Sequence, residues 1–386
     1  MPDQRHITRV TVPQTSRQMP LFERRQFVGM GLAAIESMVL SGCQKPGSTE
    51  ESPADAPAAK APEQEAPAPA MPAAPEQNAQ LEELSETRFF FDTMCLIRGV
   101  MSPDVLSGAF ERCDFFQKTL SAQEANSDID RINKAGGSPV EVQPETAELI
   151  RQALRYCEET GGLFDITIGA ASFLWDFKAG VVPDASELAK AIAHIDYTQV
   201  KVDDTTVQLL DPDARIDLGG VAKGYIADNL IAYLQEQGVK SGFVNLGGNV
   251  KTLGTKPDGS PWAVGIQDPN IPASSVDAAS GAIAKIDSTG SSVVTSGLYE
   301  RTFEKDGTSY WHILDPKTGY PVQTDVVSAT VVSDRSIDGD GYTKSLFMWG
   351  SDAVAEFFED HPELQGLIIH EDGSIWTSPG SEFVLR

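Results

Sequence analysis

The 386-residue chain has few basic residues, no long hydrophobic run and no closely spaced cysteine pair. Lys and Arg number 30 against 56 Asp and Glu, a net charge of −26, which argues against broad binding to a nucleic-acid backbone because such binding needs clustered basic residues. No uninterrupted apolar run reaches the roughly 18 residues of a spanning helix, which excludes a polytopic membrane protein. The 4 cysteines form no C-x-x-C pair and no cluster with histidine, so neither a disulfide framework nor a zinc or iron–sulfur site is expected.

The first 43 residues have the pattern of an export signal. Arg24-Arg25-Gln26-Phe27 precedes a short apolar stretch, and Leu40-Ser41-Gly42-Cys43 follows it. The latter resembles a bacterial lipobox, whose cysteine is lipidated, and the paired arginines resemble a twin-arginine signal. The alternative is a buried helix with an incidental cysteine, and Met19 is an alternative start. We predict a membrane-anchored, extracytoplasmic lipoprotein that carries its lipid on Cys43.

Residues 44–80 form a Pro/Ala-rich segment with 8 Pro, 11 Ala and no aromatic residue. Such a composition buries too little apolar surface to offset the entropy of ordering the chain. In a polyproline conformation the segment would reach roughly 100 Å. We therefore interpret it as a disordered tether between the membrane anchor and a domain at 81–386.

The pattern from 81 to 386 is that of one globular domain. Apolar residues three and four apart predict helices, and β-branched and aromatic runs predict strands. The expected helices are 106–120, 145–159, 222–237, 340–350 and 353–359. The expected strands are 88–98, 242–246, 262–266, 282–286, 299–304, 310–314 and 326–332, with a hairpin turn at Asp306-Gly307. Because these elements do not alternate regularly, the expected fold class is α+β.

One segment has the features of a phosphate cradle. A predicted strand ends at Asp217, Gly219 and Gly220 form a turn, and the following helix carries Lys223 in its first turn. Free N–H groups at a helix N-terminus attract phosphate, and glycines allow it to approach the backbone. The segment matches neither common phosphate-binding motif, and an ordinary tight turn with a solvated lysine is the alternative.

Two further segments contain candidate chemical groups. His312 lies where a predicted strand meets a turn, and an imidazole beside a bound phosphate can act as a general base. A structural histidine is the alternative. Asp338 and Asp340 stand in a glycine-rich stretch and offer oxygen ligands for Mg²⁺, or else serve as helix caps.

Together and in this order, these segments resemble the ApbE-type FAD:protein FMN transferases. The resemblance covers roughly residues 85–385. Six short segments carry it: 127–133 (SDIDRIN), 161–167 (GGLFDIT), 217–225 (DLGGVAKGY), 245–249 (NLGGN), 296–301 (SGLYER) and 312–319 (HILDPKTG).

The resemblance implies a reaction and a set of site residues. FAD binds with Mg²⁺, a Thr hydroxyl of an acceptor protein attacks the FMN phosphorus, and AMP leaves. His312 is then the base. Apart from the resemblance, we consider Arg301 a candidate for support of the phosphate or the core, with a structural ion pair to a nearby acid as the alternative. The implied FAD contacts are Leu163, Phe164, Asp165, Asp217, Lys223 and Ile313, and the implied metal ligands are the Gly220 carbonyl, Asp340 and Thr343.

The sequence departs from the family at two places. In the family that this chain resembles, the metal-binding segment usually reads Asp-x-x-[Ser/Asp]-Thr. Residues 340–344 of this chain read DGYTK, so Lys344 replaces the usual Thr. A protonated lysine cannot ligate Mg²⁺ but can supply part of its charge. Some members also place a stacking Tyr where this chain has residues 123–126. We expect a transferase that modifies a Thr-containing acceptor at the outer face of the membrane, with a non-catalytic FAD-binding lipoprotein as the alternative.

Overall fold

The computed structural model describes residues 81–271 and 281–386. The predicted signal with Cys43 and the predicted tether at 44–80 lie outside the described residues. Among the helices that are described, none is both long enough and apolar enough to span a membrane.

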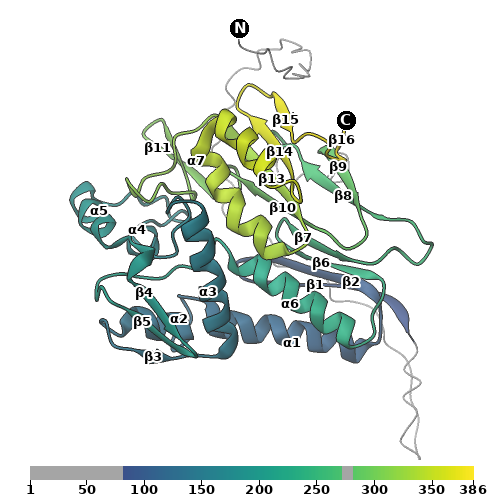
Figure 1. Ribbon diagram of the computed structural model, residues 1–386, viewed down its shortest axis with the longest axis horizontal. Helices are drawn as coiled ribbons and strands as arrows, with labels where there is room; N and C mark the ends of the chain where they lie inside the picture. Colours follow the sequence, from purple (N-terminus) through teal and green to yellow (C-terminus); the bar gives the residue numbers. More distant parts are fainter. Residues whose placement is uncertain (1–80, 272–280) are drawn as a thin grey trace, which may run out of the picture. The chain divides into compact units, whose positions relative to one another are not determined.

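An antiparallel sheet forms the centre of the domain (Figure 1). Its 8 strands lie in the order β1-β2-β6-β7-β10-β13-β14-β15, and each pairs antiparallel with its neighbours. Their bounds are Glu82–Phe90, Thr93–Met101, Gly242–Leu246, Asn249–Leu253, Ser292–Gly297, Val326–Ser333, Gln365–His370 and Ile375–Thr377. Nearly every residue of β10 and β13 is buried, because both faces of the sheet are covered there.

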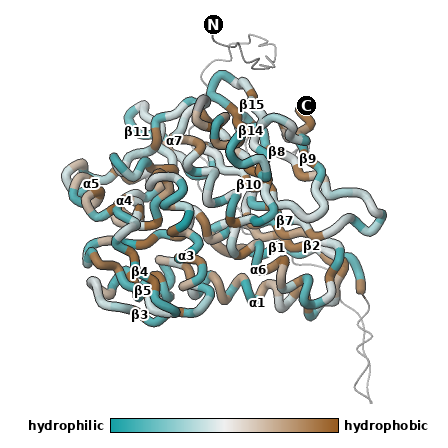
Figure 2. The backbone as a smooth tube through the Cα atoms, viewed as in Figure 1, coloured by the Kyte–Doolittle hydropathy of each residue, from teal (hydrophilic) through white to brown (hydrophobic). Residues whose placement is uncertain are grey.

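Three helices cover one face of this sheet: α1 (Pro103–Leu120), α6 (Ala222–Glu236) and α7 (Ser336–Asp360). In α1, Ser102 caps the N-terminus by accepting from the Val105 N–H, and apolar residues three and four apart turn inward. The helix α7 is broken at Gly350, whose φ is 73°, so it corresponds to the two helices predicted there. Figure 2 shows hydrophobic stretches along β2 and around β14.

A small second sheet covers part of the other face. It consists of β16 (Val384–Leu385), β9 (Ala282–Ser288) and β8 (Trp262–Gln267). Its buried Val264, Ile266 and Ile286 form one apolar cluster with Val293 and Leu367 of the central sheet. The central sheet therefore lies between a helical layer and a β layer, which confirms the α+β prediction.

Residues 121–221 form a group of short elements between β2 and β6. They comprise α2 (Asp128–Lys134), β3 (Val140–Glu141), α3 (Pro144–Glu159), α4 (Gly169–Ser172), α5 (Ala185–Ala191), the 3₁₀ turns η1 (Ile192–His194) and η2 (Tyr197–Gln199), β4 (Val200–Asp203) and β5 (Thr206–Leu209). A separate hairpin, β11 (Thr302–Lys305) and β12 (Thr308–Trp311), follows β10. Its turn is Asp306-Gly307, as predicted, with φ values of 52° and 76°.

Three strand predictions need correction. Residues 88–98 are not one strand, because Phe91 and Asp92 take φ values of 54° and 59° and turn the chain between β1 and β2. The strands of the hairpin at β11 and β12 begin and end a few residues away from the predicted 299–304 and 310–314. No strand ends at Asp217, which lies in a loop and donates its N–H to the Ile166 carbonyl at 2.8 Å.

Candidate active site

The residues predicted to carry the chemistry come from separate elements that meet in space. Lys223 lies in the first turn of α6, and Asp340 and Lys344 lie in the N-terminal half of α7. Arg301 follows β10, and His312 follows β12 directly. Helices α6 and α7 pack against each other and against β7, which brings the side chains together near the turn between β6 and β7.

The buried carboxylate of Asp340 links these elements. Only 1% of the residue is exposed. Its Oδ2 accepts from the Gly224 N–H in the first turn of α6 at 2.6 Å and from the Asn249 side-chain amide at 3.3 Å. Its Oδ1 accepts from the Lys344 ammonium at 2.9 Å. A buried charge needs such partners, and Asp340 thereby acts as the cap of α6 from the neighbouring helix.

Two lysines, with Arg301, supply the positive charge of the site. Lys344 is mostly buried, with 17% of its side chain exposed, and its ammonium also donates to the Asp340 carbonyl at 3.2 Å. Burial lowers the pKa of this ammonium and nearby Lys223 lowers it further, whereas Asp340 opposes the shift. The Lys223 ammonium donates to the Gly247 carbonyl at 3.4 Å. Cations that repel each other in one cluster favour the binding of an anion near them.

Glu300 belongs to the same cluster but was given no role by the sequence. Removal of its carboxyl group from water raises the pKa of Glu300, and the charges of Lys223, Lys344 and Arg301 lower it. The residue as a whole is exposed to solvent. Its place directly before Arg301, inside the matching segment 296–301, was the signal that could have identified it.

His312 presents an imidazole nitrogen without a partner. Its backbone N–H donates to the Arg301 carbonyl at 3.2 Å, which fixes the residue beside the cations. Its Nδ1 is buried and forms no hydrogen bond with any residue that the structure describes. Burial, followed by the charges of Arg301, Lys344 and Lys223, lowers the pKa of this imidazole from 6.5 to about 3. The ring is therefore neutral at physiological pH and has a lone pair available for a proton.

The predicted flavin contacts lie in the loop after α3. Phe164 is buried, and its ring edge lies 2.9 Å from where a Cβ on Gly220 would stand, so a larger residue at 220 would have to displace this ring. The Asp165 carboxylate accepts from the Thr167 N–H at 2.7 Å and hydroxyl at 2.6 Å, and from the Tyr197 N–H at 3.0 Å. Burial raises the pKa of Asp165. Its carboxylate therefore holds the loop in place.

Asp217 shapes the glycine turn that precedes α6. One carboxylate oxygen accepts from the Gly219 N–H at 2.9 Å, and the other accepts from the Ser172 hydroxyl at 2.8 Å. Ser172 was not predicted as a site residue. Of the remaining predicted contacts, Ile313 is buried in the core beside His312, and Leu163 is half-buried before Phe164.

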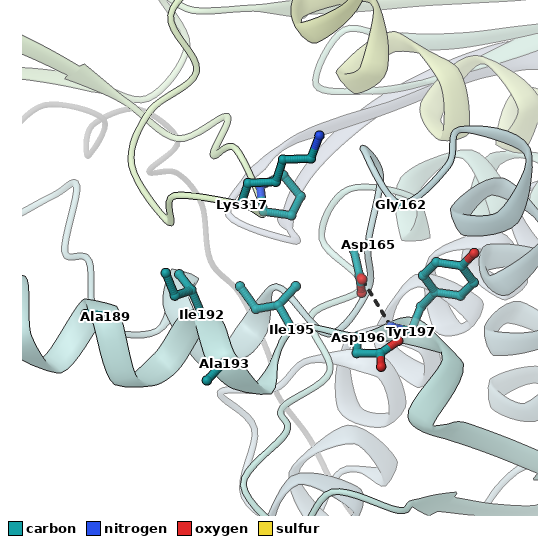
Figure 3. Close-up of a pocket in the computed structure, with 10 residues that line it drawn as sticks. Gly162, Asp165, Ala189, Ile192, Ala193, Ile195, Asp196, Tyr197 and Lys317 are labelled. Carbon is teal, nitrogen blue, oxygen red and sulfur yellow. Dashed lines mark hydrogen bonds between the residues drawn. The ribbon is translucent and has the colours of Figure 1, made fainter.

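A cavity of about 580 Å³ lies next to this loop (Figure 3). Its walls come from the loop after α3, from α5 with η1 and η2, and from the turn after β12. Figure 3 shows Asp165 and Tyr197 joined by a hydrogen bond at one side of it. The lining residues are Gly162, Asp165, Ala189, Ile192, Ala193, Ile195, Asp196, Tyr197, Pro316 and Lys317. Apolar walls with a few polar groups suit a ring system bearing hydrogen-bonding edges.

The two aspartates considered as metal ligands face different parts of the molecule. Asp338 turns toward α3, where it pairs with Arg155 at 3.1 Å and accepts from the Tyr156 hydroxyl. It is not the N-cap residue of α7 either, since Arg335 holds that position. Of the two, only Asp340 belongs to the charge cluster.

The predicted metal ligands are a poor fit to Mg²⁺. The Lys344 ammonium is bonded to Asp340, and its side chain passes the backbone at Gly220, where a Cβ would stand 3.9 Å from the Lys344 Cε. Thr343 has no exposed surface, and its hydroxyl accepts from the Ser296 hydroxyl at 2.9 Å. Mg²⁺ requires near-octahedral oxygen ligands and is repelled by an adjacent ammonium. We therefore assign no step to a metal at this position.

Three cations lie near a buried imidazole nitrogen that has no partner, an arrangement that can accept an anionic, phosphate-bearing ligand. Comparisons with known proteins agree with this class. The ApbE family model matches residues 91–368. A FAD:protein FMN transferase of Treponema pallidum is 32% identical over 330 residues, which cover 78% of this chain and 88% of the relative. One of Klebsiella pneumoniae is 35% identical over 274 residues, which cover 70% and 83%.

A solved structure of similar fold supports the same assignment. The crystal structure of the ApbE protein of Thermotoga maritima aligns with a TM-score of 0.70 at 30% identity, and the alignment covers 77% of this chain and 97% of that one. This chain belongs to the ApbE family.

Proposed function

We propose that this enzyme transfers FMN from FAD to a threonine hydroxyl of an acceptor protein and releases AMP. The hydroxyl oxygen forms a bond to the FMN phosphorus, the bond from that phosphorus to the bridging pyrophosphate oxygen breaks, and AMP leaves with the bridging oxygen. The observation that carries the proposal is the unpartnered Nδ1 of His312 among Arg301, Lys223 and Lys344. The names of the curated relatives support the flavin chemistry.

Each part of the cluster then has a task in the transfer. His312 accepts the proton of the attacking hydroxyl, since its imidazole is neutral before the reaction. Lys223 and Lys344 neutralise the charge of the pyrophosphate and of the leaving phosphate. Asp217 and Asp165 hold the two loops that would bound the flavin, and the cavity beside Asp165 would receive part of its ring system.

We further propose that the enzyme acts outside the cytoplasm while anchored to a membrane through Cys43. The support is the lipobox-like Leu40-Ser41-Gly42-Cys43 and the Pro/Ala-rich composition of 44–80. A tether of roughly 100 Å would let the domain reach acceptors held at the membrane surface.

A labelling experiment tests the transfer. The purified full-length chain is incubated with FAD and an acceptor domain that carries one threonine at an exposed site. Transfer gives a covalently fluorescent acceptor on a denaturing gel and an equal amount of AMP. An acceptor with that threonine changed to valine is the control and stays unlabelled.

The alternative function is FAD binding without catalysis, for storage or delivery. The hydrogen bond from the Lys344 ammonium to the Asp340 carboxylate favours this alternative, because a carboxylate bonded to lysine is less available to bind a metal. Tight FAD binding without labelled acceptor in EDTA or in Mg²⁺ would establish this alternative in place of transfer.

A further inference from the structure

We propose that the ammonium of Lys344 takes the place of a divalent cation in this chain, so that FAD binds without a metal at Asp340. The inference deepens the proposed function and rests on FAD being the ligand. It concerns the position of the predicted metal, where the residues of the structure do not suit Mg²⁺.

The geometry places the ammonium where a metal would bind its carboxylate ligand. Asp340 and Lys344 stand four residues apart on α7, so their side chains share one face of the helix. The Lys344 Nζ lies 2.9 Å from Oδ1 of Asp340 and 3.2 Å from its carbonyl oxygen. Because both residues are largely buried, water competes little for this pair.

The other oxygen atoms that a metal would need are already engaged. Oδ2 of Asp340 accepts two hydrogen bonds, from Gly224 and Asn249. The Thr343 hydroxyl is buried against Ser296. Only the Gly220 carbonyl remains of the predicted set, and one carbonyl does not hold Mg²⁺.

The charge balance of the cluster also depends on Lys344. Lys223, Lys344 and Arg301 act on Glu300 as cations, and Asp340 acts on it as an anion. Without Lys344, two cations would face the two carboxylates of Asp340 and Glu300, and no positive charge would be left for a pyrophosphate. Lys344 supplies the surplus positive charge that a bound metal ion would otherwise supply.

Three full-length proteins test this proposal: wild type, Lys344→Thr and Lys344→Met. FAD affinity is measured by flavin fluorescence in EDTA and in Mg²⁺, and metal binding is measured directly with Mn²⁺ by electron paramagnetic resonance. Lys118→Met is the matched control, because Lys118 is an exposed lysine of α1 with 68% of its side chain accessible. Circular dichroism tests whether each variant is folded. Lys344→Arg keeps the positive charge, so it can be measured if the other Lys344 variants do not fold.

The proposal makes a distinct forecast for each protein. Wild type, Lys118→Met and Lys344→Arg should bind FAD with the same affinity in EDTA and in Mg²⁺ and should not bind Mn²⁺. Lys344→Thr should bind Mn²⁺, and its FAD affinity should fall by about tenfold or more when Mg²⁺ is removed, because its charge then comes from the metal. Lys344→Met should bind FAD weakly in both buffers.

Two results would overturn the inference: Mn²⁺ binding by wild type as tight as that of Lys344→Thr, or a wild-type FAD affinity that collapses in EDTA and returns with Mg²⁺. Failure of the proposed function has a different signature. If wild type binds FAD equally in both buffers but labels no acceptor, transfer is refuted and the inference stands. If wild type binds no FAD in any buffer, both are refuted.

Discussion

At the scale of single residues, the site depends on groups that burial has shifted from their ordinary behaviour. His312 keeps a neutral imidazole because the surrounding protein and three cations disfavour its protonated form. Asp340 stays buried because it accepts from the backbone N–H of Gly224, the amide of Asn249 and the ammonium of Lys344. Both effects require a folded protein, since solvent would remove them in the unfolded chain.

Replacing His312 by alanine should slow transfer while leaving FAD binding nearly unchanged. A positioned general base contributes on the order of 10²- to 10⁴-fold to a rate, and the cations that hold the pyrophosphate remain in the variant. Single-turnover labelling of the acceptor measures the rate, and fluorescence titration measures the affinity. An unchanged rate would remove His312 from the mechanism.

The imidazole should also make folding stability depend on pH. The unfolded chain takes up a proton below about pH 6.5, whereas the folded state holds the pKa of His312 at about 3. The stability that His312 contributes is therefore complete above pH 6.5 and is lost as pH falls toward 3. Between pH 6.5 and 5, wild type should lose up to about 1.4 kcal/mol per pH unit more than His312→Gln. Urea titrations at each pH test this, and parallel curves would contradict it.

At the scale of elements, the packing of α6 against α7 decides where the charged residues meet. Gly224 makes this approach possible, because a Cβ on it would lie 2.5 Å from the Ser336 carbonyl oxygen and 2.6 Å from the Ile337 Cα. Its N–H simultaneously donates to Asp340. One glycine thus sets both the spacing of the two helices and the position of the buried carboxylate.

Gly224→Ala should destabilise the fold by about 1–3 kcal/mol, because backbone atoms of α7 would have to move. Gly290→Ala is the matched control: nothing lies within 4 Å of its Cβ position and its φ is ordinary, so its stability should change by less than about 0.5 kcal/mol. Chemical denaturation measures both variants. Equal stabilities would show that the helices accommodate a methyl group at this contact.

Element predictions succeeded where the local pattern is strong and failed where it is weak. The ranges of α1, α3 and α6 agree with apolar spacing and with the glycines or prolines at their ends. The hairpin of β1 and β2 was missed because its turn uses Phe91 and Asp92 in place of the usual glycine or asparagine. The strand β10 was also missed, since its Ser292–Gly297 segment contains small polar residues that become buried only between two layers.

At the scale of the whole molecule, the proposed function requires a strongly acidic chain to bind a dianionic ligand, and three of its 30 basic residues gather at the site. The net charge of −26 would repel FAD from most of the surface. Lys223, Lys344 and Arg301 all act on His312 as cations, so the local charge can favour an anion where the net charge of the chain does not.

Removing the proposed lipid anchor should release the enzyme from membranes without affecting its chemistry. We expect Cys43→Ser to move from the membrane to the aqueous fraction and to lose incorporation of a labelled fatty acid. Its transfer rate toward a water-soluble acceptor should equal that of wild type, because Cys43 lies far along the chain from the site residues. Membrane attachment that survives this substitution would refute the anchor.

The sequence alone determined the α+β class, the main helices and the short segments that assign the family, because these depend on local spacing and on residues that must stand close together in the chain. The sequence also identified Lys344 as a departure from the family's usual metal-binding segment. Only the tertiary structure decided that Asp338 faces α3 while Asp340 faces the site. It also decided that the Lys344 ammonium forms an ion pair with the Asp340 carboxylate. Hydrogen-bond partners such as Gly224 and Asn249 are distant in sequence, and which of them reaches a buried carboxylate depends on how the helices and the sheet pack together.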